Sequence, residues 1–150
     1  MRALIQRVRR ASVTIGGELH SQIGHGLLVL VGVTADDTAE DIEWLVGKIL
    51  RLRIFDDSEG VMNLDVGQVG GQIMAVSQFT LYASTRKGNR PSYIKAAPES
   101  VSRPLYEAFV ACMERESGHR PATGVFGADM QVELLNDGPV TIFIDSKNRE

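Results

Sequence analysis

A short apolar run, Leu27 to Val33, limits the folds open to this chain more than any other feature. The run is rich in valine and leucine and is interrupted only by Gly32. Such a segment is typical of a strand that is buried on both faces at the centre of a sheet. It is far too short to cross a bilayer as a helix, so we expect no association with a membrane.

Further strands are predicted on either side of this run. Residues 11–15 and 18–23 flank Gly16-Gly17, which is a hairpin signal. The other predicted strands cover residues 2–8, 72–83, 130–135 and 140–145. Together with the central run, these segments make about seven strands.

Two segments with helical spacing separate the strands. The apolar side of the first predicted helix, 38–52, carries Ile42, Leu45, Val46, Ile49 and Leu52. This spacing is typical of an amphipathic helix, and residues 36–38 offer side chains that cap its start. A second helix is predicted from about residue 102 to 116, with Pro104 in its first turn and Gly118 just beyond its end.

The predicted helices do not alternate with the strands, which argues against a doubly wound fold. We expect an α+β fold, with a mainly antiparallel or mixed sheet or barrel of about seven strands and two helices. No linker, repeat or low-complexity tract divides the chain, so we expect a single domain over residues 1–150.

The composition narrows the chemistry. The net charge of −3 means that any nucleic acid must bind to a local basic patch. Cys112 is the single cysteine, so no internal disulfide forms and a reducing compartment fits; we expect it buried as an apolar residue. The histidines are scattered and no Gly-x-Ser-x-Gly motif occurs, so we expect no metal, no cofactor and no α/β-hydrolase triad. The N-terminus lacks the apolar core of a signal peptide, which predicts a cytoplasmic protein.

The segment Ser77-Gln78-Phe79-Thr80-Leu81, the first signature, combines polar and apolar side chains within a predicted strand. Side chains alternate along a strand, so Gln78 and Thr80 are expected on one face and the other three on the opposite face. A polar pair on one face indicates a cleft lined with hydrogen-bonding groups. The alternative is that Gln78 and Thr80 face bulk solvent on a half-exposed sheet.

The segment Asn136-Asp137-Gly138-Pro139-Val140-Thr141, the second signature, lies between two predicted strands. Asp-Gly between strands is typical of a hairpin turn. The proline after the glycine offers another interpretation, since an X-Pro bond adopts the cis form at low cost. A cis Gly138-Pro139 unit would hold two carbonyl groups rigidly, and glycine would let this backbone approach a ligand.

Three segments in the same order resemble the D-aminoacyl-tRNA deacylase family over essentially the full length of the chain. The N-terminal segment from Arg2 to Thr14 resembles the start of that family. The first signature resembles one family motif, and the second resembles its Gly-cis-Pro motif.

The resemblance implies a hydrolase that releases D-amino acids, and glycine, from the terminal adenosine of tRNA. It implies a homodimer in which Gly138-Pro139 of one subunit enters the pocket of the other and rejects L-aminoacyl groups. The residues that it assigns to the catalytic pocket are Ser77, Gln78, Phe79 and Thr80. Arg7 is expected to steady the Gly-Pro loop, with Asn136 and Thr141 in support.

Two mechanisms remain open for such a site. Backbone N–H groups near Phe79 and Thr80 are the expected donors to the oxyanion of ester hydrolysis. The nucleophile is then either an activated water, which we favour, or the Thr80 hydroxyl, which requires a nearby base.

Several residues outside the pocket are candidates for RNA contacts. Arg86, Lys87 and Arg90 follow the first signature and are candidates for phosphate contacts; the alternative is a solvated loop. Residues 124–130 are expected to help form the adenine pocket, again from the resemblance. Two rival functions are a non-catalytic tRNA-binding module and an esterase for small molecules.

Overall fold

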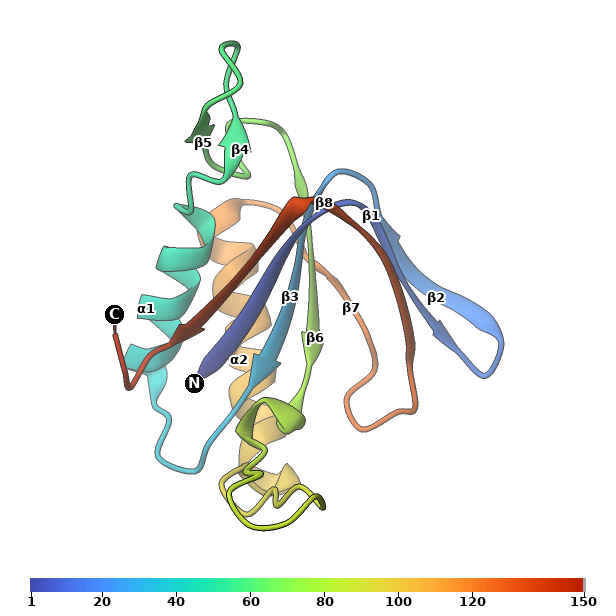
Figure 1. The fold of residues 1–150 in the computed structure, drawn as a ribbon, viewed down its shortest axis with the longest axis vertical. Coiled ribbons are helices and arrows are strands. Elements are labelled where there is room, and N and C mark those ends of the chain that lie inside the picture. Colours follow the sequence, from blue (N-terminus) through green and yellow to red (C-terminus); the bar gives the residue numbers. More distant parts are fainter. Residues whose placement is uncertain (150) are drawn as a thin grey trace.

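The computed structural model describes residues 1–149 as a curled six-stranded sheet with two helices packed on one face (Figure 1). The strands of this sheet are β1 (Arg2–Ile15), β2 (Glu18–Ile23), β3 (Gly26–Gly32), β6 (Gln72–Ser77), β7 (Ala122–Thr123) and β8 (Gln131–Asp145). The helices are α1 (Ala39–Leu50), α2 (Glu99–Ser117) and a short 3-10 helix, η1 (Phe79–Tyr82). A separate two-stranded sheet consists of β4 (Phe55–Asp56) and β5 (Met62–Leu64).

The long strand β1 organises the sheet. Residues 2–8 of β1 pair with β3, and residues 11–15 pair with β2. β8 runs antiparallel along the other edge of β1 for nearly its whole length. A strand that changes neighbours midway has to bend, so the sheet curls towards a barrel. β3, β6 and β7 pair in parallel, which makes the sheet mixed. The predicted fold class is confirmed.

The apolar run of β3 is buried on both faces, as predicted, except at the half-buried Leu30. Leu27, Val29 and Val31 belong to the core between the sheet and the two helices. Leu28 packs on the opposite face, in a smaller core that also contains Met74 of β6 and lies inside the curl of the sheet. The two cores explain why this strand has no position for a polar side chain.

Two pairs of predicted strands are single strands in the structure. Residues 2–8 and 11–15 belong to one strand, β1, whose exposed Arg9 and Arg10 mark the bend between its two partners. Residues 130–135 and 140–145 likewise belong to β8. The hairpin interpretation of Asp137-Gly138 is therefore wrong, because both halves of β8 pair with β1 in the same direction.

The helices are where the sequence places them, with shifted ends. Thr38 caps α1, and Asp41 completes a capping box with it. The prediction that Pro104 lies in the first turn is wrong, because α2 begins at Glu99 and Pro104 is its sixth residue. Its exposed ring faces solvent. Gly118 ends α2 in the left-handed conformation, at φ 75°, as expected. Cys112 is buried, and burial raises the pKa of its thiol.

Within residues 1–149, no helix is long and apolar enough to cross a membrane. The same part of the chain contains no cluster of three histidine, cysteine or acidic side chains that is suited to a metal ion.

Candidate active site

The first signature lies where β6 ends and the backbone turns. Gln78 donates its backbone N–H to Val31 of β3 over 2.7 Å, which extends the parallel pairing by one residue. The chain then forms η1, with Leu81 N–H donating to Gln78 O over 3.2 Å. The prediction of a strand over 72–83 is therefore wrong beyond Ser77. The alternation of faces that it implied for Phe79 and Leu81 does not apply.

Gln78 and Thr80 nevertheless lie together. The Gln78 side-chain amide donates to the Thr80 hydroxyl oxygen, and both residues are half-buried. They therefore do not simply face bulk solvent, which was the alternative interpretation of the pair. Between them in sequence, the Phe79 side chain is 57% exposed. The turn thus presents a hydroxyl, an amide and an exposed aromatic ring within three consecutive residues.

Two backbone donors of this turn are unpaired. Within residues 1–149, the N–H groups of Phe79 and Thr80 have no hydrogen-bond acceptor. The first N–H groups of any helix lack partners inside the helix. Here they follow each other at the end of β6, and such a pair suits an oxygen that acquires negative charge. That these two N–H groups act as oxyanion donors stays a prediction.

Arg2 holds η1 in place, a role that the sequence did not reveal. Its guanidinium donates to Leu81 O over 2.9 Å and to the Asp145 carboxylate over 2.7 Å, and it lies 4.4 Å from the centre of the Tyr82 ring. Burial raises the pKa of the Asp145 carboxyl, but hydrogen bonds from Arg2 and from Lys147 N–H outweigh it, so this pKa is lowered. The contacts join residues far apart in sequence, which explains why no local pattern indicated them.

The second signature forms a wide bulge within β8 opposite Arg7, referred to below as the loop. Gln6 pairs with Thr141 and Val8 with Asn136, so Arg7 alone faces the four residues 137–140. The Gly138–Pro139 peptide bond is cis, and both residues are exposed. The sequence had left the cis state open.

Gly138 occupies a position that excludes a side chain. Its φ is +142°, and an added Cβ would lie 2.7 Å from Val140 Cγ2 and 2.9 Å from Val140 N. Val140 is the next residue but one, so this clash lies within the loop itself. Glycine is therefore required here on grounds of both backbone conformation and space.

Arg7 anchors the loop from beneath. The Arg7 side chain is 9% exposed; its Nε donates to Asp137 O over 2.9 Å, and its Nη1 donates to Ile54 O over 2.6 Å. The Asp137 carboxylate lies 3.4 Å from Arg7 Nε and 3.0 Å from Arg9 Nε. A buried guanidinium with this many partners holds the start of the loop firmly.

Asn136 closes the base of the same loop. Val140 N–H donates to the Asn136 side-chain oxygen over 3.0 Å, and the Asn136 amide donates back to Val140 O over 3.2 Å. The Thr141 hydroxyl accepts from Gln6 and from Asn136, over 3.2 and 3.3 Å. These contacts brace the base of the loop, and the part of Asn136 and Thr141 in the site stays a prediction.

The two signatures do not meet within one chain. Ser77 is in register with Val31 of β3, which pairs with Ala3 of β1, whereas the loop lies opposite Arg7. Four residue steps along β1, roughly 13 Å, therefore separate them lengthwise. Three strand spacings across β8, β1, β3 and β6, roughly 14 Å, separate them sideways.

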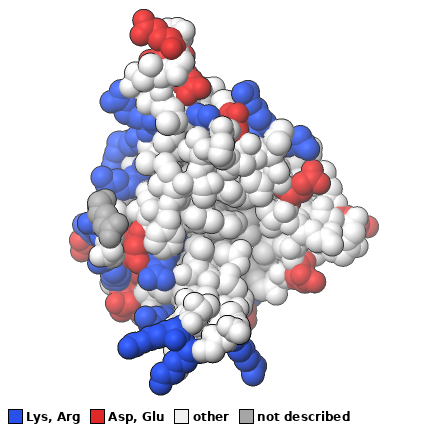
Figure 2. Space-filling model, viewed as in Figure 1, with Lys and Arg blue, Asp and Glu red and all other residues white. Residues whose placement is uncertain are grey.

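The basic segment after η1 lies at the same end of the molecule as the first signature. Arg86, Lys87 and Arg90 are all exposed. Figure 2 shows lysine and arginine side chains projecting at the bottom of the molecule, where this segment runs in Figure 1. The local basic patch that RNA binding requires is therefore present beside η1.

Residues 124–130 also extend towards that end. β7 runs parallel to β6 with Thr123 beside Ala75, so the following residues continue in the direction of Ser77. The Tyr106 hydroxyl donates to Ala75 O over 2.8 Å, and its ring lies 5.8 Å from that of Phe126. This position is compatible with a contribution to an adenine pocket.

Comparison with known proteins decides the family. The model of the D-Tyr-tRNA(Tyr) deacylase family matches residues 4–145. The chain belongs to this family. A protein of Parabacteroides distasonis named D-aminoacyl-tRNA deacylase is 61% identical over 150 residues, covering 100% of both chains. One of Chlorobaculum parvum with the same name is 54% identical over 149 residues, covering 99% of this chain and 100% of that one.

Two solved structures share the fold of this chain. One titled c-Myc DNA Unwinding Element Binding Protein superposes with a TM-score of 0.90 at 43% identity, over 97% of this chain and 98% of that chain. A probable eukaryotic D-amino acid tRNA deacylase gives 0.83 at 18% identity, over 95% and 97%, and shows the shared fold alone. The family resemblance and the enzyme class predicted from the sequence are confirmed.

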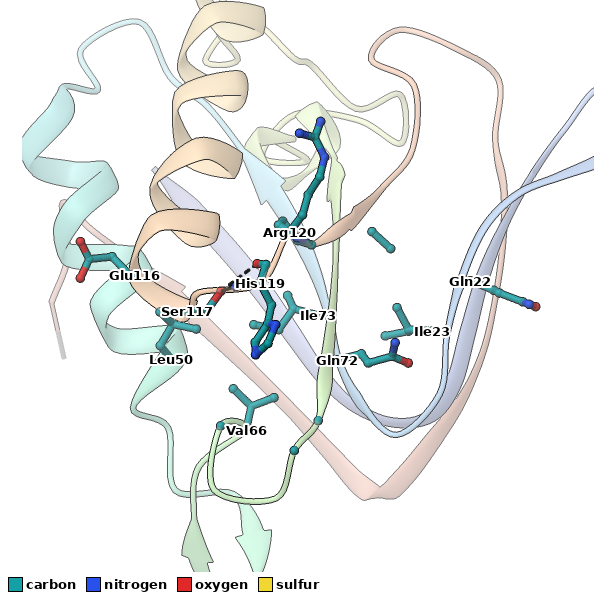
Figure 3. A pocket seen from close by; sticks show the side chains of 15 residues that line it. Gln22, Ile23, Leu50, Val66, Gln72, Ile73, Glu116, Ser117, His119 and Arg120 are labelled. Atoms are coloured by element: carbon teal, nitrogen blue, oxygen red, sulfur yellow. Dashed lines mark hydrogen bonds between the residues drawn. The ribbon is translucent and has the colours of Figure 1, made fainter.

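A cavity of about 800 Å³ lies apart from both deacylase signatures (Figure 3). Its lining includes Gln72 at the start of β6, Val66 in the loop before it, and His119 and Arg120 beyond α2. Ser77 lies at the opposite end of β6. The cavity therefore does not coincide with the candidate active site. That site lies at the surface, where the N–H groups of Phe79 and Thr80 have no acceptor within residues 1–149.

Proposed function

We propose that the chain hydrolyses the ester between a D-amino acid, or glycine, and the terminal adenosine of tRNA, and spares L-aminoacyl-tRNA. Hydrolysis of D-aminoacyl-tRNA is the activity for which the family and the curated relatives are named. One observation supports a site for it: the N–H groups of Phe79 and Thr80 lie side by side and have no acceptor in residues 1–149. With its lone cysteine, the enzyme works in the reducing cytoplasm.

The reaction uses these donors where charge develops. Water adds to the ester carbonyl carbon, and the carbonyl oxygen becomes the oxyanion of a tetrahedral intermediate. The ribose oxygen then leaves and takes up a proton. Donors fixed in advance around the oxyanion lower the barrier because they need no reorganisation during the reaction.

A water molecule, rather than Thr80, is the nucleophile in this proposal. The Thr80 hydroxyl accepts a hydrogen bond from Gln78, and within residues 1–149 no carboxylate, imidazole or amine is hydrogen-bonded to it. A threonine without a base is a poor nucleophile. Thr80 and Gln78 instead position the substrate, and the backbone amides and the ribose 2′-hydroxyl orient the attacking water.

The complete site requires two chains. The separation of the signatures in one chain supports a two-fold homodimer, in which each loop reaches the η1 turn of the other subunit. An apolar row on the face that the helices leave uncovered also supports it. Leu4 pairs with Leu30 on one side and with Phe143 on the other, and Phe143 is 51% exposed.

The Gly138-Pro139 loop selects the handedness of the amino acid in this arrangement. Gly138 and Pro139 do not pair with any residue of β1. Within residues 1–149, no side chain donates a hydrogen bond to their carbonyl oxygens. These oxygens are therefore available to the substrate ammonium, while the backbone beside them occupies the position of an L side chain. Rejection by a steric clash is stronger than the loss of one favourable contact. Glycine has no side chain to reject.

Arg86, Lys87 and Arg90 bind phosphates of the tRNA in this proposal, supported by their exposure beside η1. The same patch, together with the DNA-binding title of a structural neighbour, makes a non-catalytic nucleic-acid-binding module the alternative function.

The direct test incubates the purified protein with D-tyrosyl-, L-tyrosyl- and glycyl-tRNA and follows release of each amino acid. We expect D-tyrosine and glycine to be released, with D-tyrosine faster than L-tyrosine by about a hundredfold or more. Equal release of both enantiomers would contradict selection by the loop. Binding of tRNA without release of any amino acid would establish the alternative instead.

A further inference from the structure

The segment between η1 and α2 concentrates positive charge in an otherwise acidic chain. From Ala83 to Ala97 it contains four basic residues, Arg86, Lys87, Arg90 and Lys95, and no acidic residue. None of the four forms an ion pair with any residue from 1 to 149. Their charge is not used to stabilise the fold, and it is available to a polyanion.

Apolar side chains stand exposed in the same segment. Ile94 is 89% exposed and Tyr93 is 39% exposed. The Tyr93 ring contacts the Phe79 ring edge to face, with centroids 5.0 Å apart. Single exposed apolar residues are common on protein surfaces. Three that adjoin one another beside unpaired cations indicate a surface for a ligand that is both flat and negatively charged.

The backbone holds Tyr93 in position. Ser84 and Ser92 exchange N–H to O hydrogen bonds of 2.8 and 2.9 Å, which closes the tip of the segment. Ala96 N–H donates to Tyr93 O over 2.9 Å, and the Thr34 hydroxyl donates to Lys95 O over 2.9 Å. These hydrogen bonds fix the backbone at Tyr93. Stacking of a base on the Tyr93 ring therefore costs the protein little conformational entropy.

We propose that Tyr93 and Ile94 form a stacking platform for the nucleotide that precedes the terminal adenosine of tRNA, with phosphates of the single-stranded 3′ end bound by the four cations. Aromatic platforms combined with cations are how proteins hold single-stranded nucleic acid. The inference rests on the proposed function, which places the terminal ester at the N–H groups of Phe79 and Thr80. Phe79 links the two sites, since its ring contacts Tyr93.

Substrates of increasing length test the platform. The enzyme is given D-tyrosine esterified to adenosine, to the trinucleotide CCA and to whole tRNA. We expect Tyr93→Ser to raise KM about tenfold for the trinucleotide and for tRNA, with kcat unchanged, because one base loses its stacking partner. The adenosine ester, which does not reach Tyr93, keeps its KM. Tyr93→Phe, the matched control, retains the ring and behaves like the parent.

The outcomes separate the platform from the activity. If the parent enzyme cleaves none of the three D-esters, the proposed function fails. If the parent cleaves them and Tyr93→Ser impairs the adenosine ester equally, Tyr93 acts only by supporting Phe79 and the platform is refuted. Unchanged kinetics on all three substrates, or a changed oligomeric state of Tyr93→Ser or Ile94→Ser, would also refute it.

The salt dependence provides a second readout. Each phosphate contact to a single strand contributes about 0.7 to the slope of log affinity against log salt concentration. Replacing Arg86, Lys87 and Arg90 with glutamine should lower that slope for tRNA by about 2. Replacement of Arg120, an exposed arginine that lines the remote cavity, is the control and leaves the slope unchanged. Equal slopes for the parent and the triple variant would contradict phosphate binding by this segment.

Discussion

At the scale of single residues, the candidate site depends on main-chain atoms more than on reactive side chains. Phe79 contributes an unpaired N–H to the site and an exposed ring to the surface beside it. Gly138 contributes a backbone that no other residue can reproduce, because an added Cβ meets Val140. A substitution that changes the backbone at these positions should therefore affect activity more than one that changes only a side chain.

Phe79→Pro and Phe79→Ala separate the two contributions of Phe79. Phe79 is the first residue of η1, where proline is tolerated, and Gln78 before it lies outside the helical region that a following proline disfavours, at φ −144° and ψ 82°. Proline removes the N–H, whereas alanine keeps it and removes only the ring. We expect kcat for D-tyrosyl-tRNA to fall by about a hundredfold or more in Phe79→Pro, and much less in Phe79→Ala. Equal losses in the two variants, with matching thermal stability, would exclude the N–H as an oxyanion donor.

At the scale of elements, the ends of the chain fasten the sheet to α1. Asp41, near the start of α1, accepts from Ser146 over 2.7 Å and from Lys147 over 2.8 Å, just beyond the end of β8. Burial raises the pKa of Asp41, but hydrogen bonds from Lys147, Ser146 and Thr38 outweigh it, so the pKa lies well below its usual 3.8. Asp145, which is bonded to Arg2, belongs to the same stretch, so this fastening also fixes the support of η1.

The lowered pKa of Asp41 predicts how stability varies with pH. A carboxyl whose pKa is lower in the folded state stabilises the protein above its unfolded pKa and loses that contribution as pH falls below it. Lys147→Gln removes one of the hydrogen bonds that lower the pKa of Asp41. The Tm of this variant should therefore lie below that of the parent at about pH 6, and this gap in Tm should close towards about pH 2. Arg120→Gln, which removes an exposed 3.6 Å pair with Glu114, should show little gap at either pH. A Lys147→Gln gap that stays constant with pH would contradict this role of Asp41.

The elements also show what sequence patterns predict and what they miss. The apolar run of β3, the capping residue of α1 and the apolar side of α1 are local signals. The structure contains all three where expected. The end of β6 was missed because Ser77 to Leu81 alternates like a strand, while the turn at Gln78 depends on its pairing with Val31. The continuity of β8 was missed because Asp-Gly between two strands is typical of a hairpin turn. Only the pairing of both halves with β1 shows that the chain continues in one direction.

At the scale of the whole molecule, the candidate site residues come from the family resemblance, and the fold adds the distance between the two signatures. The resemblance named both signatures, but no sequence pattern shows that they lie on different strands, at different heights along β1. The contacts that hold them, from Arg2 to η1 and from Arg7 to the loop, span long distances in sequence. The separation makes a two-chain site the central claim of this account.

That claim is tested by combining two defective chains in one dimer. Phe79→Pro damages the pocket, and Gly138→Ala displaces the loop, because its Cβ would lie 2.7 Å from Val140 Cγ2. Each variant alone should release D-tyrosine slowly from D-tyrosyl-tRNA, because Phe79→Pro lacks an oxyanion donor and Gly138→Ala misplaces the carbonyl oxygens that hold the substrate ammonium. The mixed dimer, isolated through two different affinity tags, places one intact pocket against one intact loop.

The decisive measurement is the rate of D-tyrosine release by that mixed dimer. If each site combines the pocket of one chain with the loop of the other, the mixed dimer recovers about half of the parent rate, since one of its two sites is fully intact. A rate no higher than the mean of the two variant homodimers would show that pocket and loop act within one chain, and would contradict the account.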